Sequence, residues 1–323
     1  MNISQGLPSS PIPGHPVLTI GNFDGQHLGH QALLKAVTDS ARTIHGVPTV
    51  LTFNPHPVQV LRPGSSHKFL SELEDKYAFF EHMGIAELVV LPFTAELAAL
   101  LPAQFVETVL CQGLGIRKLI VGENFVFGKG RSGSIRDLTV LGEKAHFTVD
   151  PIPPVVVGEE IVSSTRIRNC LARGRVQEAA HCLGRPYRLG GPVIAGERRG
   201  TPMGWPTANI RLPSHRVFPV DGIYATVGWI EGKAWPSVSY IGTRPTFREG
   251  ERFVEVHIFD QNLDLYGREL NVDFVEMVRE DRTFPNVEEL LHQMKADGER
   301  ARNLLARHQC LLPNPGESSS RHL

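Results

Sequence analysis

The sequence has few cysteines, almost no net charge and no long apolar run. The cysteines are Cys111, Cys170, Cys182 and Cys310. They form no C-x-x-C pair and are too few for a disulfide framework, so we expect thiols in a reducing compartment. The 33 basic and 34 acidic residues leave a formal charge of −1, which excludes a general electrostatic attraction to nucleic acid or to an anionic membrane. Any anion-binding site must therefore be local.

No apolar stretch approaches the ~18 residues that a membrane span needs. Residues 1–16 lack the basic start and apolar run of a secretory signal, and the chain contains no internal repeat. We therefore expect a soluble, cytoplasmic protein with neither a membrane nor a nucleic-acid partner. At 323 residues the chain is long enough for two domains, each with its own core.

The first half alternates predicted strands and helices. Short apolar runs predict strands at 17–21, 48–53, 87–91, 118–122 and 146–150. Helical spacing follows the first strand, and Gly46 ends that helix. Such alternation predicts a parallel sheet covered by helices, with ligands beyond the carboxyl ends of the strands. His27, His56 and Asn124 each follow a predicted strand, so we expect them to be able to meet at that edge.

Two local signals refine the helices of this half. Ser71 and Glu74 have the spacing of a capping box ahead of a helix that runs to Gly84. Pro102 should split the next helical stretch, because its ring cannot continue the hydrogen-bond ladder.

The pattern changes near residue 184. Two short helices are predicted at 164–173 and 175–183, and strands then follow at 187–195, 222–230, 235–241, 252–259 and 269–278. Short strands without intervening helices predict a small antiparallel barrel. A long final helix has an apolar stripe that suits packing on this barrel. The polar tail at 311–323 is predicted to be disordered.

The segment 17–30, V-L-T-I-G-N-F-D-G-Q-H-L-G-H, is the most informative part of the chain. Gly21 and Gly25 allow the backbone to approach a ligand closely. The helix that follows offers unpaired N–H groups and a positive dipole end to an anion. His27 and His30 are three residues apart across the first helical turn and can face the same phosphate oxygens.

Two other interpretations of this segment stay open from the residues alone. It could be a structural turn with two surface histidines, or half of a zinc site. Zinc requires three or four ligands, and no cysteine or carboxylate at matching spacing lies nearby.

The pattern G-x-F-D-G-x-H-x-G-H resembles the signature of the HxGH nucleotidyltransferases, in the form found in prokaryotic bifunctional riboflavin kinase/FAD synthetases. Asn54-Pro55-His56-Pro57, Gly122-Glu123-Asn124-Phe125-Val126-Phe127-Gly128 and Val162-Ser163-Ser164-Thr165-Arg166-Ile167-Arg168 resemble further segments of that family. Asn124 stands where the family more often has Asp. The residues that the resemblance assigns to binding ATP and its phosphates are Gly21, Phe23, Asp24, Gly25, His27, His30, Asn124, Ser164, Thr165 and Arg168, with His27 and His30 acting in catalysis.

The second half carries Gly204-Trp205-Pro206-Thr207-Ala208-Asn209, which resembles the G-x-P-T-A-N segment of riboflavin kinases. The resemblance assigns Thr207 and Asn209 to Mg²⁺ and the phosphates of ATP, Glu255 to catalysis and flavin binding, and Arg279 to flavin binding. Oxygen donors suit Mg²⁺. Taken alone, the segment is a proline-containing turn and Glu255 a solvated strand residue. Thr201 replaces an arginine that is usual in the family.

The resemblance spans about residues 16–308. It implies an α/β nucleotidyltransferase domain with a Rossmann-like parallel sheet at 16–183, followed by a small antiparallel β-barrel riboflavin kinase domain with a C-terminal helix at 184–310. The implied activity converts riboflavin to FMN and FMN to FAD, with ATP as co-substrate and Mg²⁺ as cofactor. The sequence leaves the oligomeric state open.

Three rival functions remain. A nucleotidyltransferase acting on nicotinate mononucleotide or phosphopantetheine explains residues 17–168 but leaves the P-T-A-N segment and Glu255 without a purpose. A flavin-binding regulator without catalysis would not need His27, His30 and Glu255. A nucleic-acid-binding barrel is disfavoured by the near-zero net charge.

Overall fold

The computed structural model describes residues 1–195, 205–243, 252–261 and 263–308. The chain divides into two compact units, the first at Met1–Ser163 and the second from Ser164 onward. The predicted tail at 311–323 and the segment around Thr201 lie outside the described residues. The domain limits at 16–183 and 184–310 remain predictions.

The first unit is a six-stranded parallel sheet with the order β1-β4-β3-β2-β5-β6. Its strands are β1 (Asn2–Gln5), β2 (Pro16–Ile20), β3 (Val47–Phe53), β4 (Glu87–Leu91), β5 (Lys118–Gly122) and β6 (Thr148–Ile152). A two-stranded pair follows, β7 (Val156–Val157) and β8 (Glu160–Ile161). The sequence predicted the parallel sheet but not β1, which pairs with β4 at the edge.

The helices of this unit are α1 (Leu28–Thr43), α2 (Pro57–Leu61), α3 (Leu73–His82), α4 (Ala95–Ala99), α5 (Pro102–Phe105) and α6 (Ile135–Ala145). A π-helix, η1 (Val106–Gly113), continues α5, and a short 3₁₀ turn, η2 (Lys129–Arg131), precedes α6. The predicted break at Pro102 is confirmed, because α4 ends before it and α5 begins with it.

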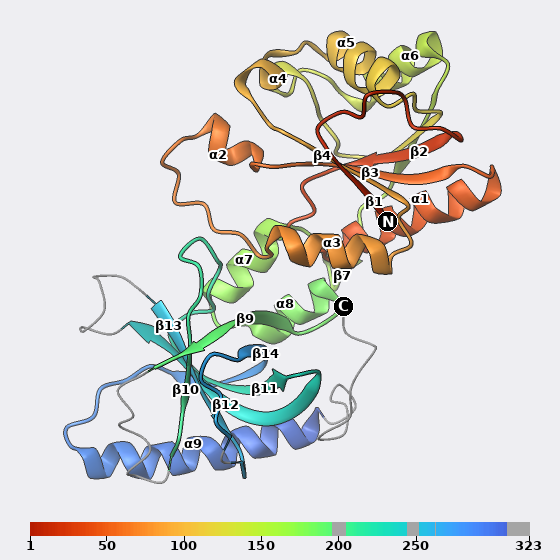
Figure 1. The fold of residues 1–323 in the computed structure, drawn as a ribbon. Helices are drawn as coiled ribbons and strands as arrows, with labels where there is room; N and C mark the ends of the chain where they lie inside the picture. Colours follow the sequence, from red (N-terminus) through yellow and green to blue (C-terminus); the bar gives the residue numbers. More distant parts are fainter. Residues whose placement is uncertain (196–204, 244–251, 262, 309–323) are drawn as a thin grey trace. The chain divides into compact units, whose positions relative to one another are not determined.

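Helices cover both faces of the sheet (Figure 1). Alternate strand residues point to opposite faces, which divides the core into two clusters. The cluster with α1 and α3 includes Val17, Val50, Leu88 and Phe80. The cluster with η1 and α6 includes Leu18, Leu51, Leu110 and Leu138. Strands buried on both faces explain why the predicted strands are continuous apolar runs rather than alternating ones.

The capping box predicted at Ser71 and Glu74 is wrong. Helix α3 begins one residue later, with Glu72 as its N-cap, and the backbone N–H of Glu72 donates to Asp75 at 2.9 Å. The Ser71 hydroxyl instead accepts a hydrogen bond from the backbone N–H of Gly25 at 3.0 Å. The Ser71 side chain therefore makes a long-range contact with Gly25 instead of capping the helix.

The second unit contains a closed barrel with the order β10-β13-β12-β11-β14-β9, in which neighbouring strands are antiparallel. Its strands are β9 (Tyr187–Ile194), β10 (Ala208–Ile210), β11 (Gly222–Ile230), β12 (Lys233–Thr243), β13 (Arg252–Ile258) and β14 (Glu269–Glu280). The predicted barrel is confirmed. The three-residue strand β10 lies in the P-T-A-N segment, which had no strand signal of its own.

Three helices complete this unit: α7 (Ser164–Ala172), α8 (Val176–Leu183) and α9 (Val287–Arg307). Helix α8 packs on β9 and β14, and α9 runs along the barrel across β11, β12 and β14 (Figure 1). The apolar stripe of α9 includes Ala301, Leu304 and Leu305, which join the barrel residues Ala225, Val227 and Phe259 in one cluster.

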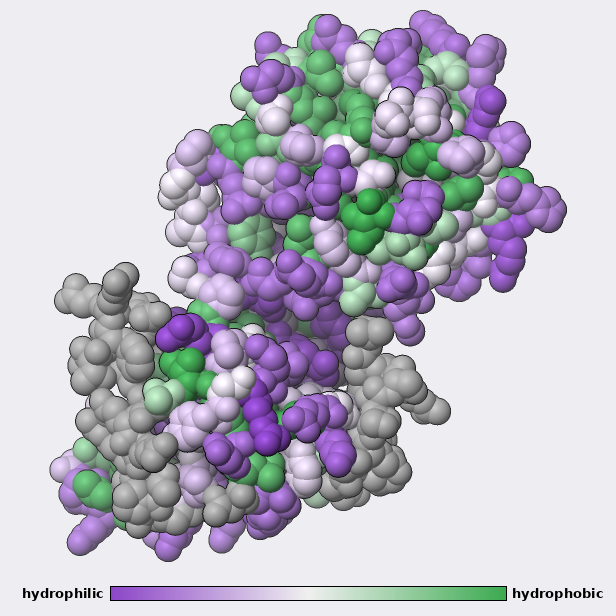
Figure 2. Space-filling model, viewed as in Figure 1, coloured by the Kyte–Doolittle hydropathy of each residue, from purple (hydrophilic) through white to green (hydrophobic). Residues whose placement is uncertain are grey.

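Hydrophilic side chains cover much of the face shown in Figure 2, with hydrophobic groups between them. Within the described part of the chain, no helix has both the length and the apolar character to cross a membrane.

Candidate active sites

The first site is the turn from Gly21 to His30, between β2 and α1. Three residues of this turn have positive φ: Phe23 at 50°, Gly25 at 86° and Gln26 at 45°. A Cβ on Gly25 would lie 2.8 Å from Cδ1 of Leu70. The positive φ favours glycine at position 25, and a Cβ there would also press on the Leu70 side chain.

His27 and His30 are brought together at the start of α1. His27 is the N-cap, and its Nδ1 accepts a hydrogen bond from the backbone N–H of His30 at 3.4 Å. The two rings are stacked, with centroids 3.6 Å apart and planes at 16°. Because Nδ1 accepts, a neutral His27 carries its proton on Nε2, which is then the donor nitrogen of this ring.

His30 is held in its neutral form. Burial lowers its pKa well below the usual value, and the charges of His27 and Lys76 lower it further. Its Nδ1 is buried and makes no hydrogen bond within the described part of the chain. The Oδ1 of Asn22, inside the same turn, is in the same condition. Buried polar atoms normally have partners, so this turn has hydrogen-bonding capacity for a ligand.

Asp24 anchors the turn to the segment that precedes α3. Its Oδ1 accepts hydrogen bonds from the backbone N–H of Leu70 at 2.9 Å and of Ser71 at 3.2 Å. Phe23 lies between two other rings, 5.1 Å from Phe80 and 5.2 Å from His30. Asp24 and Phe23 therefore shape the turn, while their predicted contacts with ATP remain predictions.

Strand order explains why this turn is suited to a ligand. The strands β3, β2 and β5 are neighbours in the sheet, so the segments that follow them share one edge. His56 follows β3 as the N-cap of α2, and Asn124 is exposed in the turn after β5. The chain order reverses between β2 and β5, and such switch points are the usual ligand crevices of open α/β sheets.

Ser164 and Thr165 lie on the first turn of α7 and Arg168 one turn further along, all in the second unit. Ser164 and Arg168 are four residues apart and share one helix face. Ile167, on the same helix, is fully buried.

The second site combines Thr207, Asn209 and Glu255. The Thr207 hydroxyl donates to Oε1 of Glu255 at 2.6 Å. Asn209 on β10 is the register partner of Glu255 on β13, so their side chains share a face. Along β13, Val254 and Val256 are buried while Glu255 is partly exposed, which places the carboxylate on the outer face of the barrel.

An aromatic contact fixes the segment that carries Thr207. The rings of Trp205 and His257 stack with centroids 4.1 Å apart, and the His257 Nδ1 lies 2.7 Å from the carbonyl oxygen of Pro206. Burial lowers the pKa of His257, which favours a neutral ring here.

A family model described as FAD synthetase matches residues 10–166, and one described as Riboflavin kinase matches residues 183–305. A Pseudomonas fluorescens protein named "Bifunctional riboflavin kinase/FMN adenylyltransferase" is 39% identical over 292 residues, which is 90% of this chain and 93% of that protein. The chain belongs to this bifunctional family.

Two further relatives extend the comparison. A Haemophilus influenzae protein of the same name is 35% identical over 287 residues, covering 88% of this chain and 92% of that protein. A solved Streptococcus pneumoniae structure, titled a macrolide-efflux protein, matches with a TM-score of 0.86 and 30% identity over 93% of this chain and 99% of that chain. The likeness therefore includes elements of both units.

In this member of the bifunctional family, the guanidinium of Arg279 is already hydrogen-bonded to other protein groups. Its Nε donates to the carboxylate of Asp297 on α9 at 3.0 Å, and its Nη1 donates to the carbonyl oxygen of Glu280 at 2.9 Å. The predicted flavin contact of Arg279 remains a prediction.

Sequence reasoning missed Tyr240, a neighbour of the second site. Tyr240 on β12 is the register partner of Glu255, and its hydroxyl donates to Asp281 at 3.1 Å. Burial and the nearby carboxylates raise the pKa of this phenol, so it stays protonated at neutral pH. No local motif points to Tyr240, because only the barrel register places it beside Glu255.

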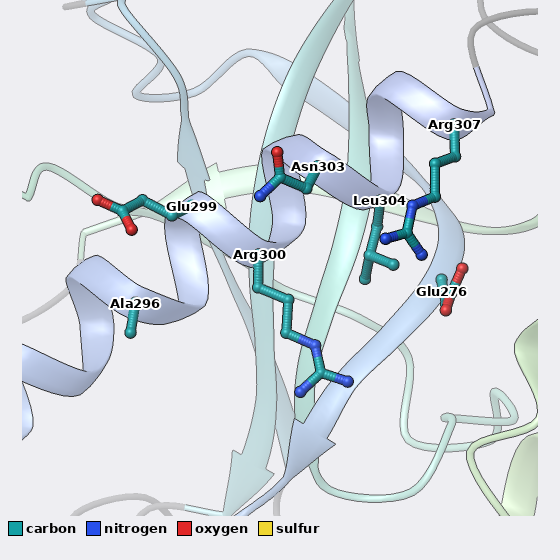
Figure 3. A pocket seen from close by; sticks show the side chains of 7 residues that line it. All are labelled: Glu276, Ala296, Glu299, Arg300, Asn303, Leu304 and Arg307. Atoms are coloured by element: carbon teal, nitrogen blue, oxygen red, sulfur yellow. The ribbon is translucent and has the colours of Figure 1, made fainter.

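A hollow of about 420 Å³ lies where α9 passes β14 (Figure 3). Arg300 and Arg307 line it, but so do Glu276 and Glu299, so the formal charges cancel. None of the residues predicted for either reaction lines this hollow.

Proposed function

We propose that this chain catalyses both steps of the family reaction: phosphorylation of riboflavin to FMN and adenylylation of FMN to FAD. The observation that carries the proposal is the occurrence in one chain of two family matches, each containing a clustered site. Both reactions use small molecules, and we propose the cytoplasm, which supplies ATP, as their compartment.

At the first site, an FMN phosphate oxygen attacks the α-phosphorus of ATP. A bond to that phosphorus forms, the bond to the β-phosphate oxygen breaks, and pyrophosphate leaves. A phosphate monoester has its second pKa near ~6 and is largely ionised at neutral pH, so no base is needed. We propose that His27 and His30 donate hydrogen bonds to the charge that develops. Phosphate binding by Ser164, Thr165 and Arg168 is a proposal from the sequence motif.

At the second site, the 5′-hydroxyl of riboflavin attacks the γ-phosphorus of a second ATP, and ADP leaves. The nucleophile is neutral, so a base contributes. We propose that the Glu255 carboxylate takes the hydroxyl proton, a contribution of roughly 10²- to 10⁴-fold. The hydrogen bond from Thr207 holds one carboxylate oxygen in position.

The oxygen donors of the second site fit Mg²⁺. The hydroxyl of Thr207 and the amide oxygen of Asn209 are hard ligands, and the 7% exposure of Asn209 limits its motion. We propose that these two residues hold Mg²⁺. When bound, the ion would neutralise charge on the phosphates of ATP.

Separation of products tests the proposal. Purified protein is incubated with riboflavin, ATP and Mg²⁺, and the flavins are separated by chromatography. FMN followed by FAD is the expected result. Formation of neither flavin would refute the proposal, and adenylylation of nicotinate mononucleotide or phosphopantetheine instead of FMN would favour the rival nucleotidyltransferase.

A further inference from the structure

Lys76 is a buried lysine on the face of α3 that packs toward the first site. Its exposure is 6%. Phe80, one helical turn further along the same face, packs edge to face on Phe23 at 5.1 Å, and Phe23 lies 5.2 Å from the ring of His30. Residues four apart on a helix lie one above the other. Lys76 therefore lies on the row of α3 that faces the turn carrying His30.

Burial and nearby carboxylates have opposite effects on the charge of Lys76. Burial lowers its pKa, and the carboxylates of Asp24, Glu72 and Asp75 act in the opposite direction. Across the described residues, however, its ammonium makes neither a hydrogen bond nor an ion pair within 4 Å. Of the three carboxylates, that of Asp24 also accepts hydrogen bonds at its Oδ1 from the backbone N–H groups of Leu70 and Ser71.

Holding a lysine at 6% exposure without a direct ion pair costs free energy, because the charge is partly withdrawn from water. Its charge also acts on His30, one of the two histidines of the first site. A polyanion at this turn would give the ammonium a counter-charge and would gain a strong contact in a region of low dielectric.

We propose that the Lys76 ammonium binds a phosphate group of ATP at the first site, beside His27 and His30. The inference rests on the proposed adenylyl transfer and adds a binding residue to it. The neutral His30 imidazole can donate a hydrogen bond but brings no charge, and Lys76 supplies a positive charge beside it.

The alternative is that Lys76 serves the fold by its attraction to Asp24. The two roles predict opposite effects on stability. Replacing an unpaired buried charge by an apolar side chain of similar length is neutral or stabilising, whereas removing one member of a structural pair is strongly destabilising.

The experiment compares Lys76→Met with Lys35→Met in the full-length protein. Lys35 is on α1, with its side chain 71% exposed and paired with Asp39, so the same charge is lost at the surface. The measurements are kcat and KM for ATP in FAD formation from FMN, inhibition by added inorganic pyrophosphate, FMN formation from riboflavin, and the Tm.

For Lys76→Met we expect kcat/KM for ATP to fall on the order of 10²-fold. Pyrophosphate inhibition should weaken, the Tm should be unchanged or higher, and FMN formation should be unchanged. Lys35→Met should match the wild type in all four measurements. A Lys76→Met rate within about twofold of wild type, a Tm several degrees lower, or an equal loss in Lys35→Met would overturn the role of Lys76. Failure of the wild type itself to form FAD from FMN would instead refute the proposed function.

Discussion

At the residue scale, burial keeps the His30 imidazole neutral, the form in which we propose that it donates a hydrogen bond to the phosphates. Its pKa is lowered well below the usual value, first by burial and then by neighbouring positive charge. The ring is therefore neutral at pH 7 and can donate or accept without first losing a proton. The ring of Phe23, 5.2 Å from that of His30, is one of the groups packed around it.

The lowered pKa of His30 predicts a pH dependence of stability. Between its folded-state pKa and about 6.5, the unfolded state binds more protons than the folded state, so stability falls as pH decreases through this window and is fully present above it. His30→Gln removes this titration. Between pH 7 and pH 5.5 we expect the Tm of the wild type, measured by circular dichroism, to fall more than the Tm of His30→Gln. A difference that stays constant would contradict the assignment.

Glu255 gives the second prediction at this scale. Glu255→Gln keeps an oxygen that can accept the hydrogen bond from Thr207 but removes the base. FMN formation from riboflavin should fall by roughly 10²- to 10⁴-fold, while FAD formation from supplied FMN should persist. Glu269→Gln, at an exposed position on β14, is the control and should retain both activities. If folded Glu255→Gln lost both, the two sites would not be independent.

At the element scale, the turn before α1 is fixed by an element distant in sequence. The turn is joined to the segment before α3 by the Asp24 carboxylate and by the hydrogen bond from Gly25 to Ser71. The first site therefore depends on how α3 docks on the sheet as well as on the strand-to-helix junction.

Gly25→Ala tests this dependence. The φ of +86° and a Cβ 2.8 Å from Leu70 should together cost about 1–3 kcal/mol. Gly64→Ala is the matched control, since its φ is +79° but no described atom lies within 4 Å of the added Cβ. We expect Gly25→Ala to lower the Tm further than Gly64→Ala and to slow FAD formation selectively. Equal effects of the two variants would show that the contact with Leu70 is unimportant.

At the scale of the whole molecule, the chain contains two packing units and one proposed site cluster in each. His27 and His30 are proposed to act in one reaction and Glu255 in the other, so mutation should be able to stop either reaction without the other. FMN would then pass from one reaction to the other as an ordinary product.

Mixing two variants, each impaired in a different step, tests this separation. His30→Ala should slow adenylyl transfer by about 10²-fold, and Glu255→Gln should block FMN formation. A mixture of the two should convert riboflavin to FAD after a lag, because FMN made by one molecule diffuses to the other. If each variant performs its remaining step but the mixture forms no FAD, FMN must be retained within one chain.

The sequence by itself determined the architecture of both halves. Apolar runs and helical spacing predicted the parallel sheet, and closely spaced strands after residue 184 predicted the barrel, because these patterns are set by burial within each element. Continuous motifs likewise led to the stacked pair His27 and His30 and to the grouping of Thr207 with Asn209.

Tertiary structure alone decided the contacts between distant segments. Ser71 holds the turn at Gly25 instead of capping a helix, Tyr240 lies beside Glu255 through barrel register, and Arg279 is bound by Asp297. Strand β10 exists because β9 and β13 pair with its three residues. Local patterns cannot specify these features, since each depends on which partner the folded chain brings within hydrogen-bonding distance.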